Sequence, residues 1–164
     1  MFEHRETVRS DWVDYNGHMN VAYYVLVFDH ATDAALDRLG VGEAYRRETG
    51  CSVFVGEMHV NYLQEVMADD ELHVVTRLLA TDAKRLVLFH EMACPRLAQV
   101  VASNEVLCVH VDLSLRRSAP WPPDVGGRLS AAVAAQAYLP PPEHGGRAVT
   151  LARRNRDPRG FTAR

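Results

Sequence analysis

Four long stretches between residues 52 and 112 alternate apolar and polar side chains, and only a few polar residues separate one stretch from the next. This alternation is typical of strands with one buried face. Joins this short favour antiparallel hairpins over helical crossovers, so we expect the strands to form a meander. The expected strands span residues 52–65, 71–81, 85–94 and 99–112.

A sheet with one apolar face needs a covering layer, and the sequence offers one long helix for it. Apolar residues recur at helical spacing over residues 21–39, with Asn20 as the expected N-cap and Gly40 just past the end. Residues 3–13 are expected to form a first strand, and residues 42–48 a short second helix. The expected class is therefore α+β, a long central helix wrapped by a curved antiparallel sheet.

The C-terminal part leaves the sheet through a proline-rich stretch. We expect a small helix over residues 127–138, ended by three prolines, so that a single domain occupies residues 1–138. Residues 139–164 are rich in arginine and poor in large apolar side chains. They are interpreted as a solvated, disordered tail or as a basic arm that wraps a neighbouring subunit or meets substrate phosphates.

Composition excludes several classes of function. A net charge of -3 over 164 residues gives no sign of nucleic-acid binding. The N-terminus has no apolar signal core, no apolar run is long enough to span a bilayer, and the three cysteines are widely spaced. We therefore expect a cytoplasmic protein without a membrane or nucleic-acid partner.

Motifs for cofactors and metals are also missing from the sequence. The eight histidines are scattered and show no pair at the spacing of a zinc site, so no metal is expected. A Gly-rich phosphate loop and the Gly-x-Ser-x-Gly elbow of serine hydrolases are absent. No cofactor is expected.

The most reactive short segment is residues 14–20, which read D-Y-N-G-H-M-N. A carboxylate, an imidazole and a turn glycine stand directly before the expected long helix. Free N–H groups and the dipole at a helix start stabilise negative charge, so this is a suitable place to polarise a carbonyl group. Taken alone, Asp14 could instead cap its own turn, and His18 could be a structural histidine.

This loop and the order of elements resemble hotdog-fold thioesterases of the 4-hydroxybenzoyl-CoA and acyl-ACP type. In that family an Asp precedes a Gly by three residues, as Asp14 precedes Gly17, and the run Asn16-Gly17-His18 is similar to the plant acyl-ACP enzymes. Segments 84–90 and 110–112 and the proline-rich exit at 120–123 extend the resemblance.

A further resemblance is to the betainyl-CoA thioesterase domain fused to some L-carnitine dehydrogenases. The matching segments are residues 6–9, 12–19, 31–34, 84–86, 88–90, 142–143 and 146–147. The resemblance implies a thioester hydrolase acting on an acyl-CoA, with betainyl-CoA as the first substrate to test.

The resemblance also implies roles for the loop residues. Asp14 is expected to act as general base or nucleophile, and the backbone N–H near Val21 to donate to the oxyanion. Asn16 would position water or the thioester oxygen, His18 would act as acid or base, and Gly17 would shape the turn.

Substrate-binding candidates lie in and beyond the loop. Tyr15, Tyr23 and Tyr24 could offer aromatic faces to a quaternary ammonium, or could be core residues. His59 and Asn61 share a strand face that could look toward the loop or toward solvent. Arg85 is a candidate for the CoA phosphates.

The family builds its groove from two chains, so a homodimer or homotetramer is expected. The alternatives to an enzyme of this type are a non-catalytic binder of acyl-CoA or acyl-ACP, and a hotdog dehydratase. A binder would keep its function without Asp14, and the pattern of a dehydratase is not found in the sequence.

Overall fold

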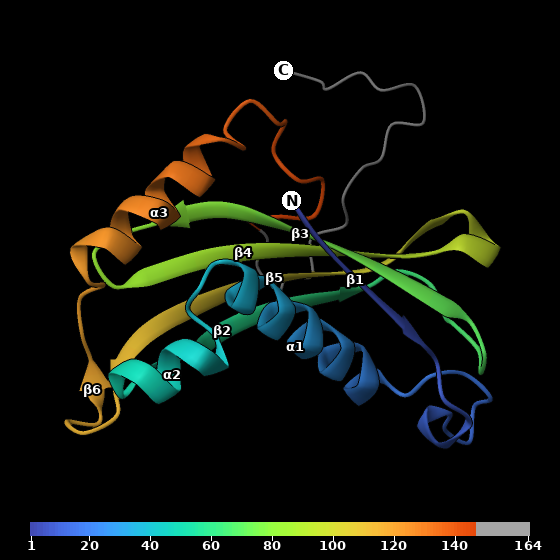
Figure 1. Cartoon of the computed structure of the whole chain (residues 1–164). Coiled ribbons are helices and arrows are strands. Elements are labelled where there is room, and N and C mark those ends of the chain that lie inside the picture. The colour runs from blue at the N-terminus through green and yellow to red at the C-terminus, as the bar shows by residue number, and fades with distance from the viewer. Residues whose placement is uncertain (147–164) are drawn as a thin grey trace.

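A computed structural model describes residues 1–146, in which a curved antiparallel sheet lies over the long helix α1 (Val21–Arg38) (Figure 1). The expected α+β class and the long helix against a curved sheet are confirmed. The strands are β1 (Phe2–Thr7), β2 (Cys51–Tyr62), β3 (Glu71–Thr81), β4 (Arg85–Cys94), β5 (Gln99–Asp112) and β6 (Arg117–Ser118). The other helices are α2 (Glu43–Thr49), α3 (Pro123–Ala134) and two 3-10 turns, η1 (Ser10–Trp12) and η2 (Pro95–Leu97).

Three strands and the long helix lie where the sequence predicts them, and the remaining boundaries differ. The first strand ends at Thr7, because η1 turns the chain before residue 13. Helix α3 starts at Pro123 and ends at Ala134, four residues earlier at each end than predicted. A proline suits the first turn of a helix, since the N–H it lacks has no intrahelical acceptor there.

The predicted meander of four strands is wrong, because the strand order is β1-β3-β4-β5-β2. Strand β2 pairs with β5, and residues 63–70 carry the chain from there to β3. The N–H groups of Leu63 and Gln64 both donate to the carbonyl oxygen of Val101, at 2.9 and 3.1 Å. A short join therefore crosses the end of the sheet here, and one edge of β2 has no partner strand among residues 1–146.

One face of α1 is buried against the inner face of the sheet. Its buried residues are Tyr24, Val27, Phe28, Ala31, Thr32, Ala35 and Leu36. Asp29, Asp33 and Asp37, spaced four residues apart, form an exposed polar stripe on the opposite side. The predicted N-cap is confirmed, since the side chain of Asn20 accepts from the N–H of Ala22 at 3.0 Å.

A buried histidine connects α1 to two strands. Thr32 on α1 donates its hydroxyl to the carbonyl oxygen of Phe28 at 2.9 Å, so its oxygen is left to accept from Nε2 of His90 at 3.0 Å. Nδ1 of His90 then accepts from the hydroxyl of Thr76 at 2.9 Å. Burial lowers the pKa of His90 to about 3, so the ring is neutral and both its nitrogens are satisfied.

The C-terminal part covers the half of β3 that lies beyond β1. Oε1 of Gln136 accepts from the N–H of Leu78 at 3.2 Å, and Arg77 donates to the carbonyl oxygen of Pro140 at 2.8 Å. Residues 139–146 therefore contact the sheet, whereas most of the predicted basic tail lies outside the described residues. Among residues 1–146, no helix has the length and apolar character needed to cross a membrane.

The buried His90 predicts a pH dependence of stability. The pKa of His90 is lower in the folded state than in the unfolded chain. Its contribution to the free energy of unfolding is therefore fully present above about pH 6.5. The contribution is lost as the pH falls, because the unfolded chain then binds a proton that the folded chain does not. The free energy of unfolding should fall by about 1.4 kcal/mol per pH unit from this group between about pH 6 and pH 4.

Urea denaturation at several pH values measures this slope. His90→Gln should show a shallower dependence than the wild type, while His73→Gln, on the opposite face of β3, should keep the steep one. Equal slopes in the wild type and His90→Gln would contradict the assignment.

Candidate active site

The loop that precedes α1 is a tight hairpin closed by a bridge between Val13 and Met19. The N–H of Met19 donates to Val66 at 2.8 Å, and the N–H of Asn20 donates to Trp12 at 2.9 Å. Gly17 has a φ of +84°, a conformation that residues with a side chain rarely adopt, so the predicted turn role of this glycine is supported by its geometry. The loop is therefore tied to both the core and the start of the helix.

The carboxylate of Asp14 is held by two donors. Its Oδ1 accepts from the N–H of Asn16 at 2.8 Å, and its Oδ2 lies 3.5 Å from the amide nitrogen of Asn20. Since Asn20 also caps α1, one side chain connects the carboxylate to the helix start. Asp14 is half-buried, so it combines a defined orientation with access to solvent.

A pocket of about 240 Å³ opens beside this loop at the first turn of α1. Its lining residues are His18, Met19, Val21, Tyr24, Tyr62, Leu63, Gln64 and Glu65. The rings of Tyr24 and Tyr62 meet edge to face with centroids 5.4 Å apart and planes at 90°. The hydroxyl of Tyr24 donates to Gln64 at 3.0 Å, and that of Tyr62 donates to the carbonyl oxygen of Val21 at 3.4 Å.

The structure brings three predicted site residues, His18, Val21 and Tyr24, into one pocket. Val21 is the first residue of α1, where a backbone N–H has no intrahelical acceptor and is oriented to receive negative charge. Tyr23 instead stacks on Trp12, with ring centroids 5.1 Å apart and planes at 11°. Tyr15 is 97% exposed and does not line the pocket of its own chain.

Asp14, Asn16 and Gly17 belong to the loop beside the pocket but are not among its lining residues, and three further candidates lie away from it. His59 and Asn61 lie on the opposite face of β2 from Tyr62, because side chains alternate along a strand. The amide of Asn61 donates to the hydroxyl of Ser103 at 3.2 Å. Within one chain this face is turned away from the pocket, and a role for His59 and Asn61 in substrate binding stays a prediction.

Arg85 lies at the other end of the sheet, at the start of β4. Its guanidinium donates to the carboxylate of Asp82 at 2.7 Å, and this hydrogen bond lowers the pKa of Asp82 to about 2. The arginine is thus paired within its own turn, and a contact with CoA phosphates stays a prediction.

The sequence interpretation missed the far wall of the pocket, formed by Tyr62, Gln64 and Glu65. Tyr62 ends β2 and the other two residues follow it, and they meet α1 because residues 63–70 cross the end of the sheet. The alternation of Val60 and Tyr62 toward the helix is the signal in the sequence that could have found the tyrosine.

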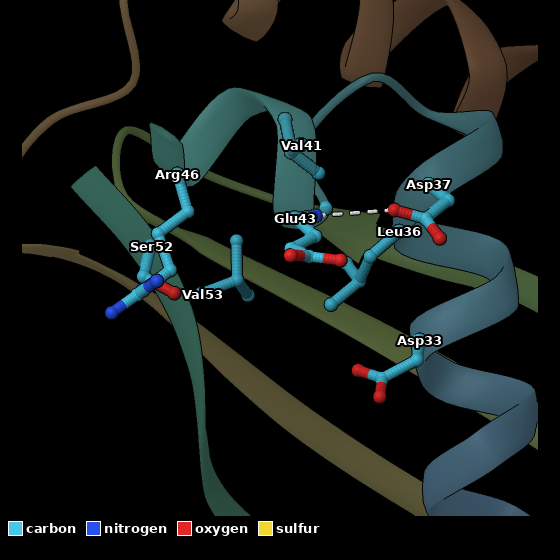
Figure 2. A pocket seen from close by; sticks show the side chains of 9 residues that line it. Asp33, Leu36, Asp37, Val41, Glu43, Arg46, Ser52 and Val53 are labelled. Atoms are coloured by element: carbon cyan, nitrogen blue, oxygen red, sulfur yellow. Dashed lines mark hydrogen bonds between the residues drawn. The ribbon is translucent and has the colours of Figure 1, made fainter. Parts of the chain in front are cut away.

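A larger cavity of about 400 Å³ lies between α1, α2 and the start of β2 (Figure 2). The carboxylates of Asp33, Asp37 and Glu43 point into it together with one guanidinium, that of Arg46. Burial, and the neighbouring carboxylates of Asp29 and Asp37, raise the pKa of Asp33. This negative lining repels the phosphates of a CoA ester, so the cavity is a poor site for such a ligand.

Comparison with protein families places residues 8–129 in the thioesterase-like superfamily. The chain is 41% identical to a betainyl-CoA thioesterase of Pseudomonas aeruginosa over 144 residues, covering 88% of this chain and 91% of that relative. It is also 38% identical to an L-carnitine dehydrogenase/betainyl-CoA thioesterase of Agrobacterium fabrum, covering 92% of this chain and 30% of that longer protein.

Solved structures show the same architecture. A Staphylococcus aureus protein in complex with CoA matches with a TM-score of 0.84 at 26% identity, covering 92% of this chain and 95% of its own. A candidate thioesterase from Pseudomonas putida KT2440 matches with a TM-score of 0.77 at 38% identity, covering 92% of this chain and 96% of its own. The predicted hotdog fold is confirmed.

The geometry of the loop predicts that Asp14→Asn will lose catalysis and not folding. The amide keeps the shape and the contact with the Asn16 N–H, but it cannot act as base or nucleophile. Thiol release from an acyl-CoA should fall by about 10²–10⁴-fold in kcat. Asp11→Asn changes an exposed carboxylate of the same segment and should keep wild-type rates. Full activity of Asp14→Asn would remove this residue from the mechanism.

Proposed function

We propose that this chain, which belongs to the thioesterase-like superfamily and is an acyl-CoA thioesterase, hydrolyses betainyl-CoA. The observation that carries the acyl assignment is the pocket at the start of α1, where two tyrosine rings stand beside a carboxylate. The 41% identity to a betainyl-CoA thioesterase supports the same substrate.

The betaine acyl group carries a trimethylammonium, whose positive charge cannot be removed by titration. Such a group binds favourably against aromatic faces, and a nearby carboxylate adds Coulomb attraction. Tyr24 and Tyr62 supply the rings, and Glu65 supplies the carboxylate on the same wall. A pocket for long acyl chains would be lined by aliphatic side chains, and its affinity would rise by about 0.8 kcal/mol per buried CH₂.

The proposed reaction uses the loop and the helix start together. As a general base, Asp14 removes a proton from the water that attacks the thioester carbonyl. As a nucleophile, Asp14 attacks this carbonyl itself and forms an anhydride, which water then hydrolyses. The N–H of Val21 donates to the oxygen that becomes negative. The C–S bond breaks, and the CoA thiolate takes up a proton, for which His18 in the same pocket is the proposed donor.

Comparing betainyl-CoA with a neutral analogue of the same shape tests whether the pocket recognises the positive charge. Tert-butylacetyl-CoA has the shape of betainyl-CoA but no charge, so it lacks the attraction to the rings and to Glu65. The wild type should show the higher kcat/KM for betainyl-CoA. Tyr62→Leu and Glu65→Gln should each reduce that preference by about 3- to 30-fold, equivalent to about 0.5–2 kcal/mol.

Both variants should keep most of their activity on the neutral analogue, which serves as an internal control for folding. A wild type without a preference for the charged substrate, or with rates that climb steadily with acyl length, would contradict the betaine assignment. Either result would leave the thioesterase mechanism at Asp14 in place.

The free edge of β2 supports the proposal that the enzyme is a homodimer or a larger homo-oligomer. This strand has 12 residues and, within residues 1–146, pairs with β5 alone, so its outer edge presents backbone groups that no described strand pairs with. Its large exposed apolar residues are Phe54 (50% exposed), Val55 (40%), Met58 (36%) and Tyr62 (47%). A long edge with apolar side chains is a template for pairing with a second copy.

Pairing of two β2 edges would also bring arginines toward the substrate. Arg116 and Arg117 line a depression of about 350 Å³ with Phe54, near the start of β2. Two antiparallel edges set the start of one β2 beside the end of the other, where the pocket lies. The arginines of one chain are therefore proposed to contact the CoA phosphates bound at the other.

Light scattering tests the assembly. The wild type should have at least twice the chain mass of 18.4 kDa at micromolar concentration. Met58→Lys places a charge on the free edge and should shift the mass toward the monomer. Met67→Lys, at an exposed methionine outside β2, should not. A monomeric wild type would contradict the proposal.

A further inference from the structure

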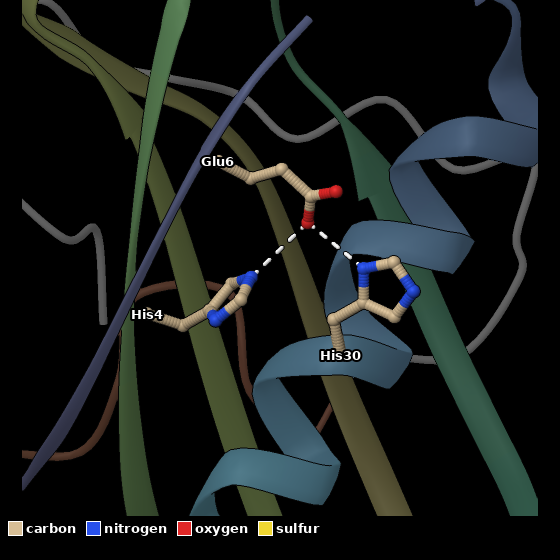
Figure 3. A group of neighbouring side chains, drawn as sticks. All are labelled: His4, Glu6 and His30. Atoms are coloured by element: carbon tan, nitrogen blue, oxygen red, sulfur yellow. Dashed lines mark hydrogen bonds and ion pairs between the residues drawn. The ribbon is translucent and has the colours of Figure 1, made fainter.

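Three side chains that are distant in sequence converge between β1 and α1 (Figure 3). His4 and Glu6 are two residues apart on β1 and share the face toward α1, from which His30 points back. Oε2 of Glu6 lies 3.1 Å from Nε2 of His4 and 2.9 Å from Nδ1 of His30. All three donor atoms lie within 4.8 Å of one another.

The donor set is one that metal ions of the zinc class accept. Two imidazoles and one carboxylate bind Zn²⁺ in known catalytic sites, with a fourth position left to water. A tetrahedral ion at about 2.0–2.1 Å from its ligands holds them about 3.4 Å apart. The two separations from Glu6 are close to this value, and the two ring nitrogens lie within 4.8 Å of each other, so side-chain rotations would suffice to admit an ion.

The local environment also suits a cation. Burial raises the pKa of Glu6, but hydrogen bonds from His30 and His4 outweigh it, and the pKa lies below its usual value. The carboxylate is therefore charged near neutral pH. The side chains of His4 and Glu6 are 23% and 21% exposed, and that of His30 is 41% exposed, so the cluster is sheltered but open to an arriving ion.

We propose that His4, Glu6 and His30 form a binding site for one zinc-class divalent ion. Each histidine would bind the ion through the ring nitrogen that faces Glu6 in this structure. Its proton would then lie on the other ring nitrogen. Because β1 is an edge strand whose one partner among the described strands is β3, the ion would fix this strand to α1. His30 is nine residues beyond the start of α1, about 14 Å along its axis, so the role is structural and separate from hydrolysis.

Isothermal titration of chelator-treated wild-type protein with ZnCl₂ tests the site. One ion should bind per chain, and the thermal midpoint should rise with zinc concentration, because the ion binds the folded state. His30→Ala and Glu6→Gln should each weaken the affinity by at least about 10-fold. Glu6→Gln preserves shape, and circular dichroism of both variants checks that they fold.

His73→Ala is the matched control, since this histidine lies on the outer face of β3, opposite Arg5 and away from the cluster. It should bind zinc as the wild type does, and His30→Ala should keep thioesterase activity. A wild type that binds no zinc, or variants at His30 and Glu6 that bind it as tightly as the wild type, would overturn the proposal. The cluster would then be a hydrogen-bonded ion pair only.

Discussion

The position of α1 inside the curved sheet is the constraint on which the site depends. Apolar burial is non-directional, so by itself it defines the position of the helix less sharply than a hydrogen bond does. The buried histidine fixes this position, since Thr32, His90 and Thr76 must meet with both ring nitrogens satisfied. An unsatisfied buried nitrogen costs about 1–3 kcal/mol, so a displaced helix is penalised. The register of α1 in turn sets where its first turn, and therefore the pocket, is found.

Local patterns in the sequence were sufficient to predict most elements. Strands β3, β4 and β5 were placed with their observed bounds, because polar turns such as the one at Asp82 stop the alternation sharply. Asn20 marked the start of α1 for a physical reason, since its amide accepts from the N–H of Ala22. The order of strands was not predictable in this way, because residues 63–70 cross the end of the sheet where their length suggests a hairpin. Strands β2 and β5 are distant in sequence, and the alternation of apolar and polar residues does not indicate which strands pair.

The candidate site likewise has one part that the sequence predicts and another that it does not. The loop from Asp14 to Asn20 could be found because its chemistry is contiguous in sequence. The wall formed by Tyr62 and Glu65 could not, since it depends on how the end of β2 approaches α1. The cluster of His4, Glu6 and His30 was missed for a related reason. Metal ligands are recognisable in a sequence when they are closely spaced, but His30 is 24 residues beyond Glu6 and reaches it only when the helix packs against the strand.

The side chain of Asn20 joins two requirements in one amide. Its oxygen caps α1 and its nitrogen lies beside the carboxylate of Asp14, so the residue must accept at one end and donate at the other. Aspartate lacks the donor, and serine is too short to serve both ends. The sequences of the loop and of the helix start cannot change independently at this position, because a substitution of Asn20 disturbs both. The opposite wall of the candidate site, from Leu63 to Glu65, carries no such double requirement, because the hydrogen bonds that fix Leu63 and Gln64 are made by backbone atoms. Side chains there can therefore diverge while the loop and the helix start are preserved.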